Sequence, residues 1–249
     1  GACKPGSTAQ TRKVSPWLYR MAWKIKLDNY LEKSVVLSAS KLVFVTNGLI
    51  KYFTQKYPST IGKENLLYWG YNEEDFENSN CSLPESNEEQ VILHAGNIFD
   101  YQNPKNFWST IKRQIESGKK LKLKFVGTVG PKIKSEIKEN GLERFTEYLG
   151  FLPYKEVIIE MCKADYLLVC ATEPRHLPGK LFEYMRTGNT IIAFGDDNDE
   201  VKEILQKTNS GILFNYEDSA EEIFAEKIPL NTNLEEVKKF DRKIIAEKL

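Results

Sequence analysis

The segment Glu173–Gly195, EPRHLPGKLFEYMRTGNTIIAFG, constrains the fold of this chain more than any other. Its pattern predicts a loop, a short helix that ends at Gly188, and a buried strand over Thr190–Phe194. A short apolar strand directly after a helix is typical of a parallel sheet covered by helices. On the predicted helix, Lys180 and Glu183 are three residues apart and therefore share one face.

The start of that helix has the chemistry of an anion site. A helix N-terminus presents unpaired backbone N–H groups and the positive end of the helix dipole, which together favour a negative ligand. Lys180 adds a mobile positive charge, and the carboxylate of Glu183 can accept two hydroxyl groups of a sugar ring. A site for a phosphate and a vicinal diol indicates a nucleotide or a sugar nucleotide.

Three segments resemble the GT-B glycosyltransferases, in particular the retaining group known as family 4. They follow the order and spacing of that family: LHAGNIFDYQNP at 93–104, EYLGFLPYKEVIIEMCKAD at 147–165 and PGKLFEYMRTGNTIIA at 178–193. The resemblance implies two Rossmann-like domains with the active site in the cleft between them, closed by hinge motion about the 70–90 linker. It specifies the fold and leaves the particular sugar open.

Strands and helices alternate from Val91 onward, which predicts an α/β fold, a Rossmann-like parallel sheet with helices on both faces. Strands are expected at 91–95, 121–126, 144–149, 165–170, 190–194 and 211–214, and helices near 104–117, 130–140, 154–163, 179–187 and 198–208. In such a sheet ligands bind beyond the carboxyl ends of the strands. The loops after 95, 126, 150 and 170 are therefore expected at one site.

The same order predicts how the chain is divided. We expect a flexible leader at 1–15, the end of the acceptor-side (N-terminal) domain at 16–71, a linker at 72–90, the nucleotide-sugar donor-binding domain at 91–230, and a segment at 231–249, helical over Leu234–Leu249, that returns toward the first domain. Within the first domain, helices are expected over 17–38 and 47–57 and strands over 41–46 and 65–69. Two such domains need about 350–400 residues. The 249 residues are thus expected to hold only a partial second Rossmann-like domain.

The composition argues against several classes of function. Lys+Arg and Asp+Glu both number 35, so no net charge draws the chain to nucleic acid. No apolar run of about 18 residues exists that could span a membrane. The 4 cysteines lack metal-ligand spacing and only 2 histidines are present, which argues against a metal site. Reduced thiols and a cytoplasmic location are the simpler interpretation.

The resemblance implies that the helix after the loop holds the donor nucleotide. The Glu183 carboxylate would accept the two ribose hydroxyls, and Lys180 would offset charge on the leaving diphosphate. Gly179 and Leu181 flank Lys180 in the same motif. The ordinary alternatives are a Glu183 paired with Lys180 and a Lys180 that is simply exposed in the first turn.

The loop before this helix departs from the commonest family pattern, in which two glutamates are separated by seven residues. The residue eight positions before Glu183 is Arg175, whereas Glu173 is ten before it. Either the loop is longer and Glu173 faces the transferred sugar, or Arg175 contacts phosphate instead, which we favour. His176 would reach the sugar or the phosphate, or it has only a structural role.

Two glycine turns are expected near the phosphates. Gly96 and Asn97, followed by Gln102, occupy the place where other family members carry an arginine and a lysine that grip the diphosphate. Glycine allows close approach of the backbone, and amides donate hydrogen bonds without charge. Turn chemistry before Pro104 explains the amides equally well. Gly127 opens a G-x-x-G turn that fits either a phosphate-side wall or a tight turn alone.

Two further features have weaker implications. Phe151 and Leu152 match the family's base-binding edge, where backbone groups read the nucleobase and an apolar side chain flanks it. His94 lies within an expected strand, where a core or sheet-edge histidine is the simpler interpretation.

The N-terminal end of the chain combines basic and aromatic residues. Before the first acid, Asp28, it contains Lys4, Arg12, Lys13, Arg20, Lys24 and Lys26, interleaved with Trp17, Tyr19 and Trp23. An interfacial helix on anionic lipid has this composition, which would give peripheral contact at the inner face of the membrane. A packing helix with a solvated basic face is the alternative that we favour.

The leading interpretation is a retaining glycosyltransferase of the hexosyltransferase class. It would move a sugar from a UDP- or GDP-sugar to a hydroxyl of a glycan or lipid-linked acceptor, in surface polysaccharide or glycolipid assembly. The resemblance implies that no cofactor or metal takes part, because helix N–H groups and basic side chains stabilise the leaving diphosphate. The alternative is a non-catalytic nucleotide-sugar-binding domain or a truncated fragment. An epimerase would need more histidines, and a phosphorylase would need a pyridoxal phosphate site.

Overall fold

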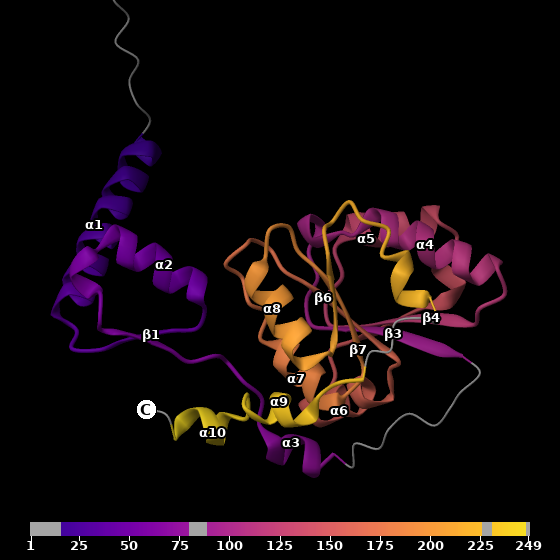
Figure 1. Ribbon diagram of the computed structural model, residues 1–249. Coiled ribbons are helices and arrows are strands. Elements are labelled where there is room, and N and C mark those ends of the chain that lie inside the picture. The colour runs from indigo at the N-terminus through magenta and orange to yellow at the C-terminus, as the bar shows by residue number, and fades with distance from the viewer. Residues whose placement is uncertain (1–15, 80–88, 226–230, 248–249) are drawn as a thin grey trace, which may run out of the picture. The chain divides into compact units, whose positions relative to one another are not determined.

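The computed structural model describes residues 16–79, 89–225 and 231–247, with side chains from residue 23 onward. The chain divides into two compact units, Gly1–Leu42 with Tyr52–Asn65 and Val43–Lys51 with Leu66–Leu249 (Figure 1). The expected leader 1–15, residues 80–88 of the expected linker, and the side chains of the first basic and aromatic residues lie outside the described part.

The second unit contains a six-stranded parallel sheet in the order β5-β4-β3-β6-β7-β8. Its strands are β3 (Gln90–Ala95), β4 (Leu121–Val126), β5 (Thr146–Gly150), β6 (Tyr166–Cys170), β7 (Thr190–Phe194) and β8 (Gly211–Phe214). The sheet confirms the predicted α/β fold. Each strand also lies within about two residues of its expected position, because strands buried on both faces are continuous apolar runs.

Helices cover both faces of this sheet, since successive strand residues point to opposite sides. Leu93 and Ile191 join one core with α6 (Tyr154–Lys163), α7 (Lys180–Thr187) and α8 (Asp199–Thr208). Their neighbours Ile92 and Ile192 join a second core with α4 (Lys105–Glu116) and α5 (Pro131–Glu139). Each fully buried Leu or Ile side chain contributes about 1.5–3 kcal/mol. The two cores therefore fix the sheet from both sides.

The expected linker is partly helical. The short helix α3 (Glu73–Glu77) buries Phe76 in the core that contains α6 and α7. Glu73 forms a bidentate ion pair with Arg186 of α7, in which Arg186 Nε donates to the carboxylate at 2.6 Å. The guanidinium lowers the pKa of Glu73. The acidic composition predicted a linker, but one apolar residue and one ion pair attach this segment to the second unit.

The C-terminal segment forms two short helices, which corrects the single helix expected over Leu234–Leu249. They are α9 (Leu234–Lys238) and α10 (Arg242–Ala246). Between them the backbone pairs with the segment before α3. Tyr71 N–H donates to the Phe240 carbonyl (3.0 Å), and Arg242 N–H donates to the Tyr71 carbonyl (2.9 Å). This long-range pairing interrupts a locally helical pattern.

The first unit is mainly helical. It contains α1 (Pro16–Ser38), as predicted, the end of α2 (Asn47–Lys56) and the turn η1 (Pro58–Thr60). Glu32 of α1 accepts hydrogen bonds from Lys56 Nζ (2.6 Å) and Tyr57 Oη (2.8 Å). The strands β1 (Leu42–Phe44) and β2 (Glu64–Leu66) are shorter than expected and form a two-stranded sheet. The partial second Rossmann-like domain thus remains a prediction.

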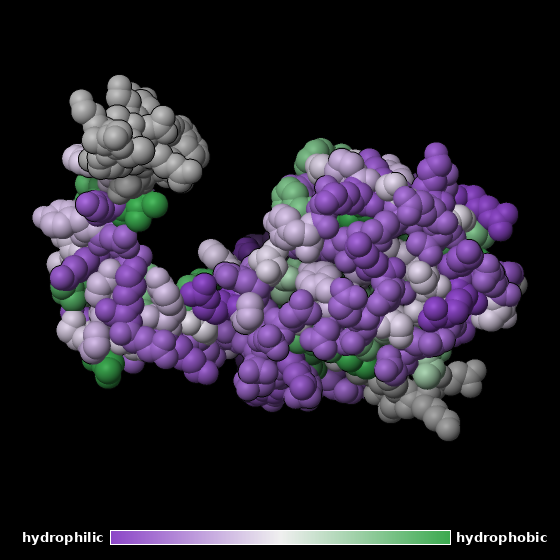
Figure 2. Space-filling view, turned by 90° about the horizontal axis from the view of Figure 1, so that it is seen from above, coloured by the Kyte–Doolittle hydropathy of each residue, from purple (hydrophilic) through white to green (hydrophobic). Residues whose placement is uncertain are grey.

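Both units expose some large apolar side chains. On α1, Trp23 is 68% and Tyr30 is 70% exposed. In Figure 2 the visible face of the second unit is largely hydrophilic, with its apolar residues in small, scattered groups. Within the described ranges, no helix is long and apolar enough to cross a membrane.

The cysteines differ from the expectation of reduced thiols. Cys162 is disulfide-bonded, whereas Cys170 is a free thiol. Burial raises the pKa of the Cys170 thiol to about 12. This group therefore stays protonated near neutral pH and is a poor nucleophile.

Candidate functional site

The sheet opens between its two central strands. The chain builds outward from β3 to β5, then crosses over and builds the other half from β6 to β8. The pairing of β3 with β6 ends at Leu93 and Leu167, whereas β3 stays paired with β4 as far as Ala95. A parallel sheet binds ligands at such a switch point, beyond the carboxyl ends of the strands. The end of β3 is thus the natural place for a ligand.

Polar side chains take over the hydrogen bonding where the two strands separate. The bonds are His94 Nδ1 to the Leu168 carbonyl (2.9 Å), Ala95 N–H to Tyr184 Oη (2.7 Å) and Gln102 Nε2 to the Cys170 carbonyl (2.8 Å). Tyr184 belongs to α7 and so ties that helix to the end of β3. At the opening, side chains therefore provide hydrogen-bond partners for these backbone groups of the two separated strands.

His94 lies at the bottom of this opening, 6% exposed. A carbonyl only accepts hydrogen bonds, so Nδ1 carries the proton and Nε2 is an acceptor. Nε2 is buried and has no hydrogen-bond partner among the described residues. Burial lowers the pKa of His94 and keeps it neutral. His94 thus occupies the buried position that the sequence favoured for it, and it lies at the edge of the candidate site.

Gly96 and Gly127 bring the loops after β3 and β4 into contact. Both adopt positive φ angles, +136° and +103°. A Cβ atom on Gly127 would lie 2.5 Å from the Gly96 carbonyl oxygen, so no larger residue fits. The side chain of Asn97 accepts a hydrogen bond from the Thr128 N–H (3.0 Å). These contacts make the two loops one continuous wall.

The first turn of α7 adds the charges. Gly179 is its N-cap, and Leu181 is fully buried in the core, which fixes the direction of the helix. Lys180 and Glu183 form an ion pair with each other. The Glu183 side chain is only 10% exposed, whereas that of Lys180 is 31% exposed. The pairing that the sequence left as an alternative is therefore present.

Tyr154 stands beside this ion pair. Its ring centre is 4.9 Å from Lys180 Nζ, within the range of a cation–π interaction. Burial, the charge of Glu183 and a hydrogen bond to that carboxylate raise the pKa of the phenol. The same loop exposes Phe151 (81%) and half-buries Leu152. An apolar, aromatic surface thus borders the two charges.

The loop before α7 is held by its own hydrogen bonds. Arg175 pairs with Glu173 at 3.3 Å, so the two candidates for the residue that faces the sugar contact each other. His176 Nδ1 accepts from the Thr172 N–H (2.9 Å), which places the proton of the neutral ring on Nε2. Burial lowers the pKa of His176. Asn198 anchors the loop by donating to the His176 carbonyl (2.8 Å).

Gln102 is buried, and its side-chain amide is hydrogen-bonded to the backbone. It is 6% exposed, donates to the Cys170 carbonyl and accepts from the Phe99 N–H (3.1 Å). Asn103 accepts from Trp108 Nε1 (2.7 Å). The hydrogen bonds of both amides lie within the turn and the strand opening. This agrees with the alternative of turn chemistry before Pro104.

A family model described as Glycosyl transferases group 1 matches residues 89–230, more than half of the 249 residues. This chain belongs to the group 1 glycosyl transferases. No curated protein matches the chain. The matched range contains the opened sheet, both glycine turns and α7.

Solved structures share the GT-B fold of this glycosyl transferase chain. Sucrose-phosphate synthase from Thermosynechococcus elongatus is 16% identical at a TM-score of 0.62, covering 90% of this chain and 60% of the other. Anabaena HepE, solved with UDP and glucose, is 15% identical at a TM-score of 0.64, and the match covers 94% of this chain and 66% of HepE. A glycosyltransferase from Rickettsia africae is 14% identical at a TM-score of 0.68, and the match covers 88% of this chain and 65% of that protein. The chain thus spans less than two thirds of each of these proteins.

Sequence reasoning missed two tyrosines of the candidate site. Tyr184 sits in the matching helix motif, yet its bond to the end of β3 appears only once α7 is placed against the sheet. Tyr154 is the first residue of α6, and nothing in its local pattern points to Lys180, which is 26 positions away. An aromatic residue directly after the Gly-x-Leu-Pro turn was the available signal.

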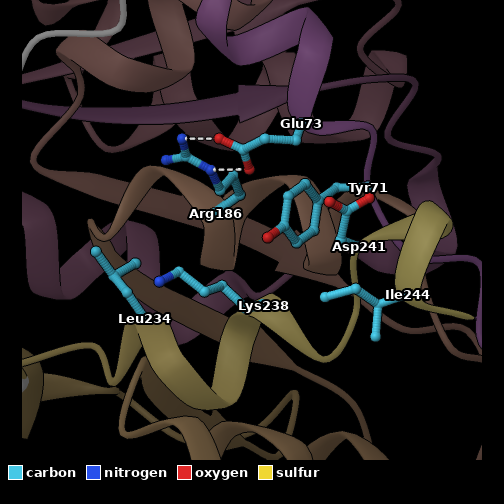
Figure 3. Close-up of a pocket in the computed structure, with 7 residues that line it drawn as sticks. All are labelled: Tyr71, Glu73, Arg186, Leu234, Lys238, Asp241 and Ile244. Carbon is cyan, nitrogen blue, oxygen red and sulfur yellow. Dashed lines mark hydrogen bonds and ion pairs between the residues drawn. The ribbon is translucent and has the colours of Figure 1, made fainter.

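A surface pocket of about 360 Å³ lies at the opposite end of α7 from Lys180 (Figure 3). Its lining is Tyr71, Glu73, Arg186, Leu234, Lys238, Asp241 and Ile244. Glu73 is paired with Arg186, and Lys238 with Glu235. Because none of its lining residues lies on the loops that follow β3, β4 or β6, we do not assign the donor to it.

Proposed function

We propose that this chain binds a nucleoside-diphosphate sugar and supplies the donor side of a retaining glycosyltransferase of family 4 type. One observation carries the proposal. At the opened end of β3, the Gly96 and Gly127 turns meet, and Tyr184 ties α7 to Ala95, the residue directly before Gly96. A close backbone wall next to a lysine and a buried carboxylate suits a diphosphate followed by a ribose.

The proposed roles follow from charge and exposure. Glu183 would accept the two ribose hydroxyls, once its ion pair with Lys180 opens. Lys180 would then turn to the diphosphate, with Arg175 as a second cation that offsets the charge of the leaving group. Gly179 would let the phosphate approach the helix N-terminus, where backbone N–H groups favour an anion.

The remaining candidates would contact the base and the sugar. Phe151 and Leu152 would border the nucleobase, and Gly96 and Asn97 would face the diphosphate. His176, with its proton on Nε2, would donate to the donor sugar or phosphate. We propose a UDP- or GDP-sugar as donor, without a metal or other cofactor.

The acceptor side is proposed from the sequence alone. Residues 16–71 would end the acceptor-side domain, 72–90 would link it to the donor domain at 91–230, and 231–249 would return toward it. A glycan or lipid-linked hydroxyl would receive the sugar in surface polysaccharide or glycolipid assembly. The exposed aromatic residues of α1 fit a cytoplasmic chain with peripheral contact at the inner membrane face, as well as a packing surface.

Thermal unfolding of the whole chain with single nucleotides tests the donor site. Stabilisation by UDP or GDP, and not by adenosine or inorganic phosphate, supports the proposal, because a ligand that binds only the folded state raises its stability. No response to any nucleoside diphosphate would contradict it.

Turnover separates the transferase from the alternative. A chain that binds UDP or GDP but neither transfers nor hydrolyses the sugar of a matching nucleotide sugar is a non-catalytic binding domain or a fragment. Transfer with an unchanged anomeric configuration supports the retaining enzyme. Inversion of that configuration would overturn the family 4 assignment.

A further inference from the structure

Tyr154 contacts the charged first turn of α7 from a different helix. It begins α6, is 44% exposed, and its ring centre lies 4.9 Å from Lys180 Nζ. Lys180 in turn pairs with Glu183. A cation, a carboxylate and a phenol thus form one compact cluster on two helices.

This cluster has to rearrange if a nucleotide binds in the proposed way. A ribose diol needs both Glu183 oxygens, and Lys180 now occupies one of them, Oε2. The Lys180 ammonium then loses its partner, and the long, flexible lysine side chain can adopt many conformations. A π-face beside it retains a cation without competing for the diol or for phosphate oxygens.

We infer that Tyr154 is a positioning and specificity residue for the donor: its ring keeps the Lys180 ammonium within reach of the diphosphate while its hydroxyl orients the Glu183 carboxylate toward the ribose diol. This inference rests on the proposed function. It assigns the ring and the hydroxyl to different parts of the nucleotide, so the two can be tested separately.

The test uses two substitutions at Tyr154 and three nucleotides. Binding of UDP, UMP and 2′-deoxy-UDP to the whole chain is measured by titration calorimetry, with the guanine series instead if only GDP binds. The ratio of the UMP and UDP dissociation constants reports the β-phosphate. The ratio for 2′-deoxy-UDP and UDP reports the diol.

Tyr154→Leu removes ring and hydroxyl, and Tyr154→Phe removes the hydroxyl alone. We expect Tyr154→Leu to reduce the β-phosphate ratio about 2- to 30-fold, the range of a cation–π interaction. Tyr154→Phe should keep that ratio and reduce the diol ratio about 2- to 10-fold, the range of one hydrogen bond. A ratio measured within one variant is insensitive to a general loss of folded protein.

Tyr148 offers a matched control. It is 41% exposed, and Lys134 Nζ lies 4.8 Å from its ring centre, but it is on β5. Tyr148→Phe and Tyr148→Leu should leave both nucleotide ratios unchanged. Equal changes at Tyr148 and Tyr154 would show a general effect of removing an aromatic–lysine pair and overturn the inference.

The remaining outcomes are distinct. If the wild-type chain binds neither UDP nor GDP, the proposed function is wrong and the inference falls with it. If the wild type binds and Tyr154→Leu weakens all three nucleotides equally, Tyr154 is only structural. Unchanged ratios in both Tyr154 variants overturn the inference and leave the proposed function intact.

Discussion

The backbone N–H of Ala95 donates a 2.7 Å hydrogen bond to the hydroxyl of Tyr184. Both groups are buried, and they join the end of β3 to the middle of α7. Burial raises the pKa of the Tyr184 phenol, so the hydroxyl stays neutral. The two halves of the candidate site, the glycine turns and the charged helix, are therefore held together by one side chain.

Removing that hydroxyl should weaken both folding and binding. Tyr184→Phe leaves the Ala95 N–H buried without a partner, which costs about 1–3 kcal/mol in the free energy of unfolding. Urea unfolding measures the loss. Tyr216→Phe is the control, because Tyr216 Oη donates to the Ala171 carbonyl (2.8 Å) on the other side of the opening. UDP or GDP affinity should fall in Tyr184→Phe by more than in Tyr216→Phe, and an equal fall would count against the coupling.

The contact between the two glycine turns gives a second prediction. Gly127→Ala would place Cβ 2.5 Å from the Gly96 carbonyl oxygen. The turns must then move apart, so we expect both lower stability and at least about tenfold weaker nucleotide binding, the effect of about 1.4 kcal/mol. Thermal unfolding and calorimetry on the same sample measure the two effects.

Gly118 provides the matched control for that substitution. Its φ of +101° is almost the same as that of Gly127, but a Cβ would meet nothing within 4 Å. Gly118→Ala should therefore cost only about 1–2 kcal/mol of backbone strain and leave nucleotide affinity unchanged. If the two variants behave alike, the close approach of the turns has no role in binding.

His94 predicts how stability depends on pH. The folded chain lowers its pKa, whereas the unfolded chain has the usual value of about 6.5. Between these two values the unfolded state binds more protons. The contribution of His94 to the free energy of unfolding is thus complete above about pH 6.5. It falls as the pH decreases toward the folded pKa, by at most about 1.4 kcal/mol per pH unit.

Urea unfolding at pH 7.5 and 5.5 measures this slope. His94→Gln keeps a donor for the Leu168 carbonyl but no longer titrates, so the slope should decrease. The pKa of His176 is lowered too, and His176→Gln should remove only the part of the slope that His176 contributes. Glu73, whose pKa Arg186 lowers, titrates below this window. A slope that is the same in wild type and His94→Gln would rule out His94 as its source.

The sequence predicted the sheet well and the site in part. Strands such as Thr190–Phe194 are apolar on both faces, so their position is a local property of the chain. Helix α3 and the break between α9 and α10 were missed, because Phe76 and Tyr71 gain their partners only from segments far away in sequence.

The charged helix motif was recognisable because its residues are three positions apart, and the Lys180–Glu183 contact follows from helix geometry. The separation of β3 from β6, and the bond from Tyr184 to the end of β3, depend on how α7 packs against the sheet. For Gln102 the sequence left a phosphate contact and turn chemistry open, and the structure shows its buried amide bonded to the backbone of the opening. No local pattern carries such information.

Titration calorimetry of the whole chain with UDP and with GDP shows whether the Lys180–Glu183 helix holds a nucleoside diphosphate. Glu183→Gln removes the charge proposed to hold the ribose, and Glu160→Gln is the control, since Glu160 is also a partly buried carboxylate paired with a lysine, Lys124, at 2.8 Å. We expect one-to-one binding of at least one nucleotide, weakened about tenfold or more by Glu183→Gln and unchanged by Glu160→Gln. Absence of binding to both nucleotides, or equal affinity in wild type and Glu183→Gln, would contradict it.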